Sequence, residues 1–368
     1  MRDTMGIIIN NPLHALGALV KNRNPITMPF FARYRLVDFA LSNLVNSGIF
    51  KIAIVTSDKY RSLLDHVGIG QEWGLSRKSQ SLVFMQGSSQ FGHSDVQHIN
   101  MVDFIKNDVV FERNKHKNII ISTSNIVSNI SYEKYIDFHN ESQADITFLT
   151  IPGSEHNTLE KEVMFITDSN NGIKEVKIGC KDVCDRVYSG IMIINHSLLD
   201  KFIEVSENTR EYEMFRIISD SIDYLNLKYM DITEYYRKID SIKNYFDANM
   251  ELIDIEKSNE VFKENNVILT KVKDNHPTLY KEGCDISNAC IASGGVIYGK
   301  ISNSVVFRHA HISENASVSN SILMEDIKIG KNAVLDFVIA DRNVTIGDHV
   351  ILKGTKESPV ILDKETVI

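Results

Sequence analysis

The sequence lacks the features that mark several large classes of protein. Its 368 residues contain no apolar run long enough to span a membrane. The 40 basic side chains are outnumbered by 48 acidic ones, which gives a net charge of -8. The chain therefore lacks the positive excess of a nucleic-acid or membrane-surface binder. Because no signal peptide is recognisable either, we expect a cytoplasmic protein with no nucleic-acid partner and no membrane partner.

Cysteine is also scarce, and the four cysteines are not spaced like metal ligands. Cys180 lies close to Cys184, and Cys284 lies close to Cys290, but no histidine stands at zinc-like spacing from either pair. This pattern predicts reduced, mostly buried thiols.

Glycine is missing where an α/β protein would hold a phosphate. The apolar stretch Gly6–Ile9 is followed by NNPLHALGAL, residues Asn10–Leu19, which contains one late glycine. A phosphate loop needs backbone N–H groups that approach the anion closely. Pro12 removes one such donor, and the Cβ atoms of the other residues keep phosphates away. The segment occupies the position of a phosphate loop, but its composition does not suit one.

Residues 1–255 alternate short apolar segments with segments of helical period. This alternation predicts an α/β, Rossmann-like domain whose mostly parallel sheet is covered by helices on both faces. Gly48 is placed to end the first long helix in a left-handed conformation. The expected strands are Gly6–Ile9, Lys51–Thr56, Asn118–Ser122, Asp145–Ile151 and Gly190–Asn195, and the expected helices include Leu36–Val45 and Ser131–Asn140.

A different period begins near residue 284, where apolar residues recur every six positions. Neither a helix nor a single hairpin strand has this period, whereas a coil of short parallel strands does. The pattern predicts a C-terminal left-handed parallel β-helix over residues 284–368, with residues 256–283 as a linker. An ordinary β-sandwich is the alternative. The side chains expected to point inward are Ile312, Val318, Ile329 and Ile346.

Several segments resemble one enzyme family. They are PFFARYRLVDFALSNLVNSGIFKIAIVT (Pro29–Thr56), YYRKIDSIKNYFDANMEL (Tyr235–Leu252) and the hexads NSVVFRHAHI and DRNVTIGDHVIL. In this order they resemble the ADP-glucose pyrophosphorylases, or glucose-1-phosphate adenylyltransferases, which make ADP-glucose from ATP and glucose 1-phosphate. The resemblance implies a nucleotidyltransferase domain followed by a left-handed β-helix, in agreement with the periodicity.

The resemblance also places the family's anion-binding groups on this sequence. The family's Arg-Ala-Lys-Pro corresponds to RNPI, so Arg23 is kept and Pro25 replaces a phosphate-binding lysine. The family's Gly-Gly-Lys-Tyr-Arg, which is associated with sugar-phosphate effectors, corresponds to Phe31, Ala32 and Arg33 in its first three positions. The resemblance therefore makes Arg33 and Arg23 candidate effector-binding residues.

The family's metal and sugar-phosphate positions are degenerate as well. Its metal-binding aspartates in Ser-Gly-Asp-His and Trp-Arg-Asp-Val-Gly-Thr correspond to Ser124 and Lys238. A hydroxyl is a poor Mg²⁺ ligand beside a carboxylate, and an ammonium repels the cation. The sugar-phosphate lysine of Glu-Lys-Pro corresponds to Gly179, although Lys177 or Lys181 would serve if the alignment slips by two residues.

These four losses predict a chain without catalytic residues of its own and without a cofactor, with Mg²⁺ expected only in a catalytic partner. The pattern resembles the GlgD-type, non-catalytic subunit of the family. It implies a regulatory role beside a catalytic glucose-1-phosphate adenylyltransferase subunit, in a heterotetramer that serves glycogen biosynthesis and can respond to a sugar-phosphate effector. One alternative is a weakly active adenylyltransferase. A second is a stand-alone sensor of sugar phosphates or nucleotide sugars.

Overall fold

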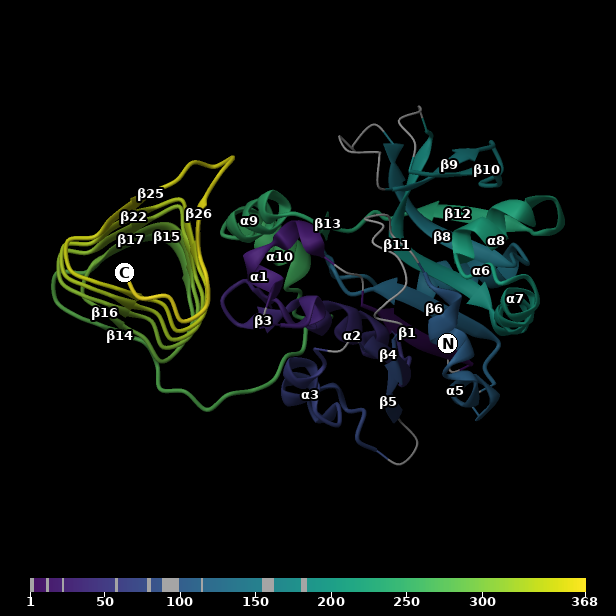
Figure 1. Ribbon diagram of the computed structural model, residues 1–368, viewed down its shortest axis with the longest axis horizontal. Coiled ribbons are helices and arrows are strands. Elements are labelled where there is room, and N and C mark those ends of the chain that lie inside the picture. The colour runs from purple at the N-terminus through teal and green to yellow at the C-terminus, as the bar shows by residue number, and fades with distance from the viewer. Residues whose placement is uncertain are drawn as a thin grey trace.

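The computed structural model consists of an α/β domain followed by a parallel β-helix (Figure 1). The structure describes residues 3–10, 13–21, 23–56, 59–77, 81–87, 99–113, 115–153, 162–179 and 184–368. Pro12, Cys180 and Lys181, which the sequence singles out, lie outside these ranges. Figure 1 shows the purple-to-teal α/β domain on one side and the green-to-yellow coils of the β-helix on the other.

A nine-stranded sheet forms the centre of the α/β domain. Its main path is β10-β9-β11-β6-β1-β4-β5, and β8 pairs with both β11 and β12. Strand β1 lies between β4 and β6 and is parallel to both. The strands are β1 (Thr4–Ile9), β4 (Lys51–Thr56), β5 (Ser81–Gln86), β6 (Asn118–Thr123), β8 (Ile146–Pro152), β9 (Val163–Thr167), β10 (Ile173–Ile178), β11 (Arg186–Asn195) and β12 (Leu227–Asp231).

The central parallel strands are buried along their whole length. All six residues of β1 and all six of β6 are buried, as expected of strands in a doubly covered sheet. This confirms the predicted α/β class. Strand β11, however, runs antiparallel to β6 and β8, which the sequence did not predict. Its register shifts at Gly190, whose φ is 99° and where a Cβ atom would lie 2.4 Å from the Thr123 hydroxyl.

Helices cover both faces of the sheet. One face packs against apolar side chains of α4, α5, α7 and α8, and the other packs against α2, α3 and α6. Gly48 follows α2 with a φ of 74°, as predicted. The helices are α2 (Leu36–Asn46), α3 (Arg61–Val67), α4 (Met101–Ile105), α5 (Asp108–Arg113), α6 (Glu133–Glu141), α7 (His196–Thr209), α8 (Met214–Asp220), α9 (Ile242–Glu251) and α10 (Ile255–Val261).

The β-helix stacks short parallel strands in register on the sides of a prism (Figure 1). Strand β17 turns one corner at Asn303, whose φ is 43°, so it pairs with β19 before the corner and with β20 after it. The four side chains expected to point inward are all buried, which confirms the six-residue period. The strands are β14 (Leu279–Tyr280), β16 (Val296–Ile297), β18 (His311–Ile312), β21 (Lys328–Ile329) and β24 (Thr345–Ile346), then β15 (Asp285–Ile291), β17 (Lys300–Val306), β19 (Ser317–Ser319), β22 (Val334–Asp336) and β25 (Ile351–Lys353), then β20 (Ile322–Leu323), β23 (Val338–Ala340) and β26 (Val360–Leu362).

The segment between the domains is fastened to the α/β domain. The Ser42 hydroxyl of α2 accepts a hydrogen bond from the Leu269 amide at 2.8 Å, and the Asn46 side-chain amide donates to the Val267 carbonyl at 2.9 Å. The Asn129 side chain bonds to the Val261 carbonyl at 2.6 Å. We call residues 262–278 the strap, because side chains of the α/β domain hold it along its first half.

None of the helices in the ranges described is long and apolar enough to cross a membrane. Cys284 and Cys290 are free thiols, and neither is joined to Cys184 by a disulfide. All three cysteines are half-buried.

Candidate functional site

The candidate site lies at the carboxyl ends of β1 and β6, where α/β proteins of this kind bind ligands. The backbone amide of Ser124, directly after β6, donates to the carbonyl of Ile9 at the end of β1, at 3.1 Å. Ser124 is buried, so its hydroxyl faces the protein interior rather than bulk solvent. Ser124, to which the resemblance assigns a metal-binding aspartate, therefore lies at this edge of the sheet and carries an alcohol.

The loop after β1 is packed with leucines. Residues His14–Leu16 form a short 3₁₀ helix, η1, and Ala18–Lys21 form the single turn α1. Leu13, Leu16 and Leu19 are buried in one apolar cluster. A phosphate loop turns backbone amides toward its ligand, whereas this loop turns side chains toward a core. The sequence-based interpretation of the loop agrees with this packing.

Lys238 ends β13 (Tyr236–Lys238), which pairs with β7 (Ile126–Ser128) just beyond Ser124. Its ammonium lies 2.6 Å from both carboxylate oxygens of Glu162. The exposed fractions of the two side chains are 6% and 3%, so this is an ion pair inside the protein. The ammonium at the former metal position thus has an internal counter-ion.

Gly179 lies beside the same carboxylate residue. Its amide donates to the backbone carbonyl of Glu162 at 3.0 Å, and its φ is 61°. On the other side, the Asn125 carbonyl accepts from the amide of Ile239 at 2.8 Å. Lys238 and Gly179 therefore both contact Glu162, a residue that the sequence analysis did not include, and the residues next to Ser124 and Lys238 are joined through their backbones.

Pro25, the fourth degenerate position, starts the 3₁₀ helix η2 (Pro25–Thr27). The Asn24 side chain caps this helix by accepting from the Ile26 amide at 3.2 Å. Proline suits the first position of a helix because its missing N–H has no partner there. The residue has become a structural element where the family has a phosphate-binding lysine.

The residues at the former metal position do not fit Mg²⁺. This cation prefers several carboxylate or phosphate oxygens in an octahedral arrangement. The carboxylate here, Glu162, is already bound through both oxygens to Lys238, and Ser124 contributes only a neutral hydroxyl. A dication would have to displace an ammonium from a buried pair, which is unfavourable.

Some polar atoms around the site have no hydrogen-bond partner. Within the part of the chain that the structure describes, these include Asn10 Oδ1, Thr123 Oγ1 and Asn125 Oδ1, which all lie at the ends of β1 and β6. Buried polar atoms are nearly always paired in folded proteins. Polar atoms without partners at this edge are consistent with a ligand-binding origin of the site.

The two candidate effector residues lie in different surroundings. Arg33 is exposed, with its guanidinium 5.1 Å from the centre of the Tyr34 ring. Phe31 and Ala32 before it have φ values of 43° and 64°, the left-handed conformation that glycine adopts at least cost. Phe31 and Ala32 therefore hold, without glycine, a conformation that a Gly-Gly pair would adopt more easily.

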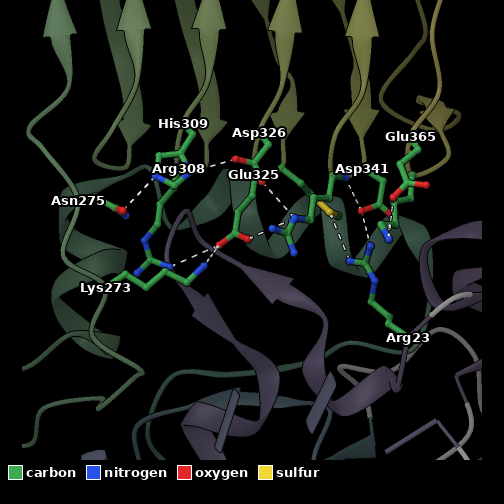
Figure 2. A network of polar contacts seen from close by, with 12 residues as sticks. Arg23, Lys273, Asn275, Arg308, His309, Glu325, Asp326, Asp341 and Glu365 are labelled. Atoms are coloured by element: carbon green, nitrogen blue, oxygen red, sulfur yellow. Dashed lines mark hydrogen bonds and ion pairs between the residues drawn. The ribbon is translucent and has the colours of Figure 1, made fainter. Parts of the chain in front are cut away.

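Arg23 is bound to the β-helix. Its guanidinium forms an ion pair with Asp341, and its Nη1 lies 3.6 Å from the Met324 sulfur (Figure 2). Asp341 directly follows β23, and Met324 directly follows β20. Sequence reasoning missed Asp341, the first residue of the hexad segment DRNVTIGDHVIL, because the hexad pattern shows which side chains point inward and not which acidic residues pair with the other domain. It missed Glu162 because no motif surrounds that residue, although a buried lysine predicts that some carboxylate must lie nearby.

Comparison with known proteins agrees with this geometry. The nucleotidyl transferase family matches residues 16–254, and the GlmU-like C-terminal hexapeptide family matches residues 274–358. The glycogen biosynthesis protein GlgD of Geobacillus stearothermophilus is 36% identical over 355 residues, which cover 96% of this chain and 94% of that protein. GlgD of Bacillus subtilis is 31% identical, covering 83% and 79%. The glucose-1-phosphate adenylyltransferase of Mycoplasma mobile is 28% identical, covering 79% and 77%.

Proposed function

Because this chain belongs to the nucleotidyl transferase family, we propose that it is a catalytically impaired, regulatory subunit of glucose-1-phosphate adenylyltransferase. The relatives named GlgD support a role in glycogen biosynthesis. In this role the chain joins a catalytic subunit in a tetramer. It modulates the conversion of ATP and glucose 1-phosphate into ADP-glucose and diphosphate by that subunit.

The observation that carries the proposal is the buried contact between Lys238 and Glu162. Nucleotidyl transfer depends on positive charge that is free to neutralise the phosphates as diphosphate leaves. Here the ammonium is neutralised by Glu162 within the protein, and the carboxylate is in turn unavailable to a metal ion. The leucine-lined loop and Pro25 remove further phosphate contacts from the same edge of the sheet.

Arg33 and Arg23 are the residues through which we propose that an anionic sugar phosphate acts. Arg33 is exposed and held over Tyr34, which leaves its guanidinium accessible to a phosphate. Arg23 is paired with Asp341, so an anion at that position must compete with the carboxylate. The variant Arg33→Ala should reduce the response of the assembled enzyme to sugar phosphates more than Arg237→Ala, which removes another exposed arginine.

The direct test is diphosphate release from ATP and glucose 1-phosphate. The isolated chain should be slower than a catalytic subunit by about 10³ to 10⁶, since each charge-stabilising group is worth about 10² and such losses are not additive. The catalytic subunit from the same genome, assayed with and without this chain, should change its kinetics when the chain is added. Turnover by the isolated chain within about tenfold of the catalytic subunit would instead identify a weakly impaired adenylyltransferase.

Restoring the carboxylates separates metal binding from turnover. The double variant Ser124→Asp and Lys238→Asp adds two carboxylates at the candidate site, one of them in place of the ammonium that pairs with Glu162, and should bind Mg²⁺ more tightly, as measured by calorimetry. It should remain inactive, because residues 10–19 still offer no phosphate cradle. The matched control, Ser124→Asn with Lys238→Met, removes the ammonium without adding charge and should not gain Mg²⁺ affinity.

Co-purification tests the assembly. The chain and the catalytic subunit, expressed together, should elute as one species of tetrameric mass. A chain that stays monomeric at micromolar concentration with the catalytic subunit present contradicts the proposal.

A stand-alone sensor is the second candidate function. The unpartnered oxygens of Asn10, Thr123 and Asn125 favour it, because they could accept hydrogen bonds from a sugar or nucleoside. Tight binding of ADP-glucose by the isolated chain, together with no association with the catalytic subunit, would support the sensor over the regulatory subunit.

A further inference from the structure

The segment that follows β1 is joined to the β-helix by a contact whose structural consequence goes beyond the proposed role of Arg23 in effector binding. Arg23, shortly after this loop, reaches across to the β-helix and pairs with Asp341 (Figure 2). The exposed fractions of these two side chains are 12% and 3%, so the pair is largely removed from water. The backbone of the β-helix also orients the Asp341 carboxylate, which accepts a hydrogen bond from the amide of Arg342 at 2.6 Å.

Apolar packing reinforces the same contact. Leu13, Leu16 and Leu19 share one buried cluster with Met324 and Ile339 of the β-helix. The leucines of this segment and apolar side chains of the β-helix therefore belong to one core, and one guanidinium of the segment pairs with one carboxylate of the β-helix. This complementarity extends over residues that lie more than 300 positions apart in the chain.

A second group of charges ties the strap to the same corner of the β-helix. Lys273 of the strap lies 3.1 Å from Glu325, and Arg308 lies 3.5 Å from the same carboxylate. Asn275, also in the strap, hydrogen-bonds to His309 at 3.0 Å (Figure 2). Acidic and polar residues at one corner of the β-helix thus bind both Arg23 and the strap.

We infer that residues 13–21 and Arg23 serve as an interdomain latch, in which the β-helix fixes the conformation of the loop after β1 through Arg23 and Asp341. A paired charge that is nearly buried resists loss of its partner, because the remaining charge is left without compensation. The guanidinium is charged at every accessible pH and can fork onto a carboxylate, which suits it to this role. The latch is a property of the isolated chain and does not depend on its catalytic state.

Hydrogen exchange measured by mass spectrometry tests the latch. The amides to follow are those of Leu16 and Val20, which bond within the loop at 3.0 and 3.2 Å. In Asp341→Asn the carboxylate becomes a neutral amide of nearly the same shape, and exchange of peptides covering residues 13–21 should accelerate about 5- to 30-fold. Exchange in β6, at the centre of the sheet, should stay as it is in the unmodified chain.

Two further variants and one control complete the experiment. Arg23→Gln should match Asp341→Asn, whereas Arg23→Lys keeps the charge and should stay within about threefold of the unmodified chain. The control is Glu314→Gln, which breaks the exposed Glu314–Lys331 pair inside the β-helix and should leave the loop unchanged. The inference is overturned if Asp341→Asn and Arg23→Gln affect residues 13–21 no more than the control does, or if they accelerate exchange equally in β6.

Discussion

Two cation–carboxylate pairs, both nearly buried, lie on the side of the α/β domain where a nucleotide would be expected. Lys238 and Glu162 belong to the same domain and bring the end of β13 against the start of β9. Arg23 and Asp341 belong to different domains. Both pairs join a cation to a carboxylate. The first pair lies within the candidate site, whereas the second links the α/β domain to the β-helix.

The two pairs differ in what they connect. Lys238 and Glu162 neutralise each other within the α/β domain without any ligand. At the loop, leucines pack into an apolar core, and the neighbouring arginine has its counter-ion on the β-helix. Only the second pair makes a segment of the α/β domain dependent on the other domain.

The largest effect should come from breaking the pair inside the α/β domain. Lys238→Met leaves Glu162 charged, buried and alone, and should lower the free energy of unfolding by about 3–5 kcal/mol. Replacing both residues, in Lys238→Met with Glu162→Leu, should restore most of this loss, because a packed apolar pair avoids the desolvation cost. Urea unfolding followed by circular dichroism measures all three proteins.

An exposed pair provides the control for this measurement. Lys243 and Asp247 form an ion pair on the surface of α9, and Lys243→Met should change the free energy of unfolding by no more than about 0.5 kcal/mol. If Lys238→Met is as harmless as this control, then the Lys238 ammonium is not held in the protein interior.

A smaller effect should follow from breaking the pair between the domains. Asp341→Asn should cost about 1–3 kcal/mol, the usual range for a hydrogen bond to a charged group. Because this pair joins two folded units, the loss should appear as a separation of the unfolding of the α/β domain from that of the β-helix. Differential scanning calorimetry should show two transitions further apart than in the unmodified chain. A uniform shift of both transitions would contradict an interdomain role.

The β-helix and the central sheet were open to prediction from sequence because each has its own periodicity. Ile312, Val318 and Ile329 follow a six-residue spacing that only one type of coil explains, and all three are buried. The strands β1 and β6 each contain three consecutive isoleucines, as is typical of strands buried on both faces of a sheet. In both cases a local pattern determines the position of each side chain.

The contacts that define the two pairs have no such local pattern. Glu162 and Asp341 are single acidic residues far from their partners in the chain, and only the folded arrangement brings them together. The same holds for the strap, where Ser42 and Asn46 bond to a segment more than 200 residues away. The antiparallel course of β11 and the close approach of Gly190 to Thr123 are likewise not evident from a single sequence.

The smallest expected effect concerns pH and the carboxylate of Glu325 at the interdomain corner. Burial by itself raises the pKa of Glu325, but Lys273, Arg35 and Arg342 around it lower the pKa by more, so that it lies below its ordinary value of 4.5. Since the folded-state pKa is depressed, the pairing stabilises the protein above the unfolded-state pKa. This contribution is lost as pH falls through the lower, folded-state value.

The comparison of Glu325→Gln with the unmodified chain isolates this contribution, because the other carboxylates titrate in both proteins. At pH 7 the variant should be less stable by roughly 1 kcal/mol or less, as expected for a partly exposed group of ion pairs. The difference should shrink as pH falls below about 4.5, because a protonated glutamate resembles glutamine in charge and shape. Thermal unfolding at a series of pH values between about 7 and 3.5 measures the difference. A constant difference across that range would mean that Glu325 contributes by packing rather than by charge, and that Asp341 alone carries the electrostatic coupling between the domains.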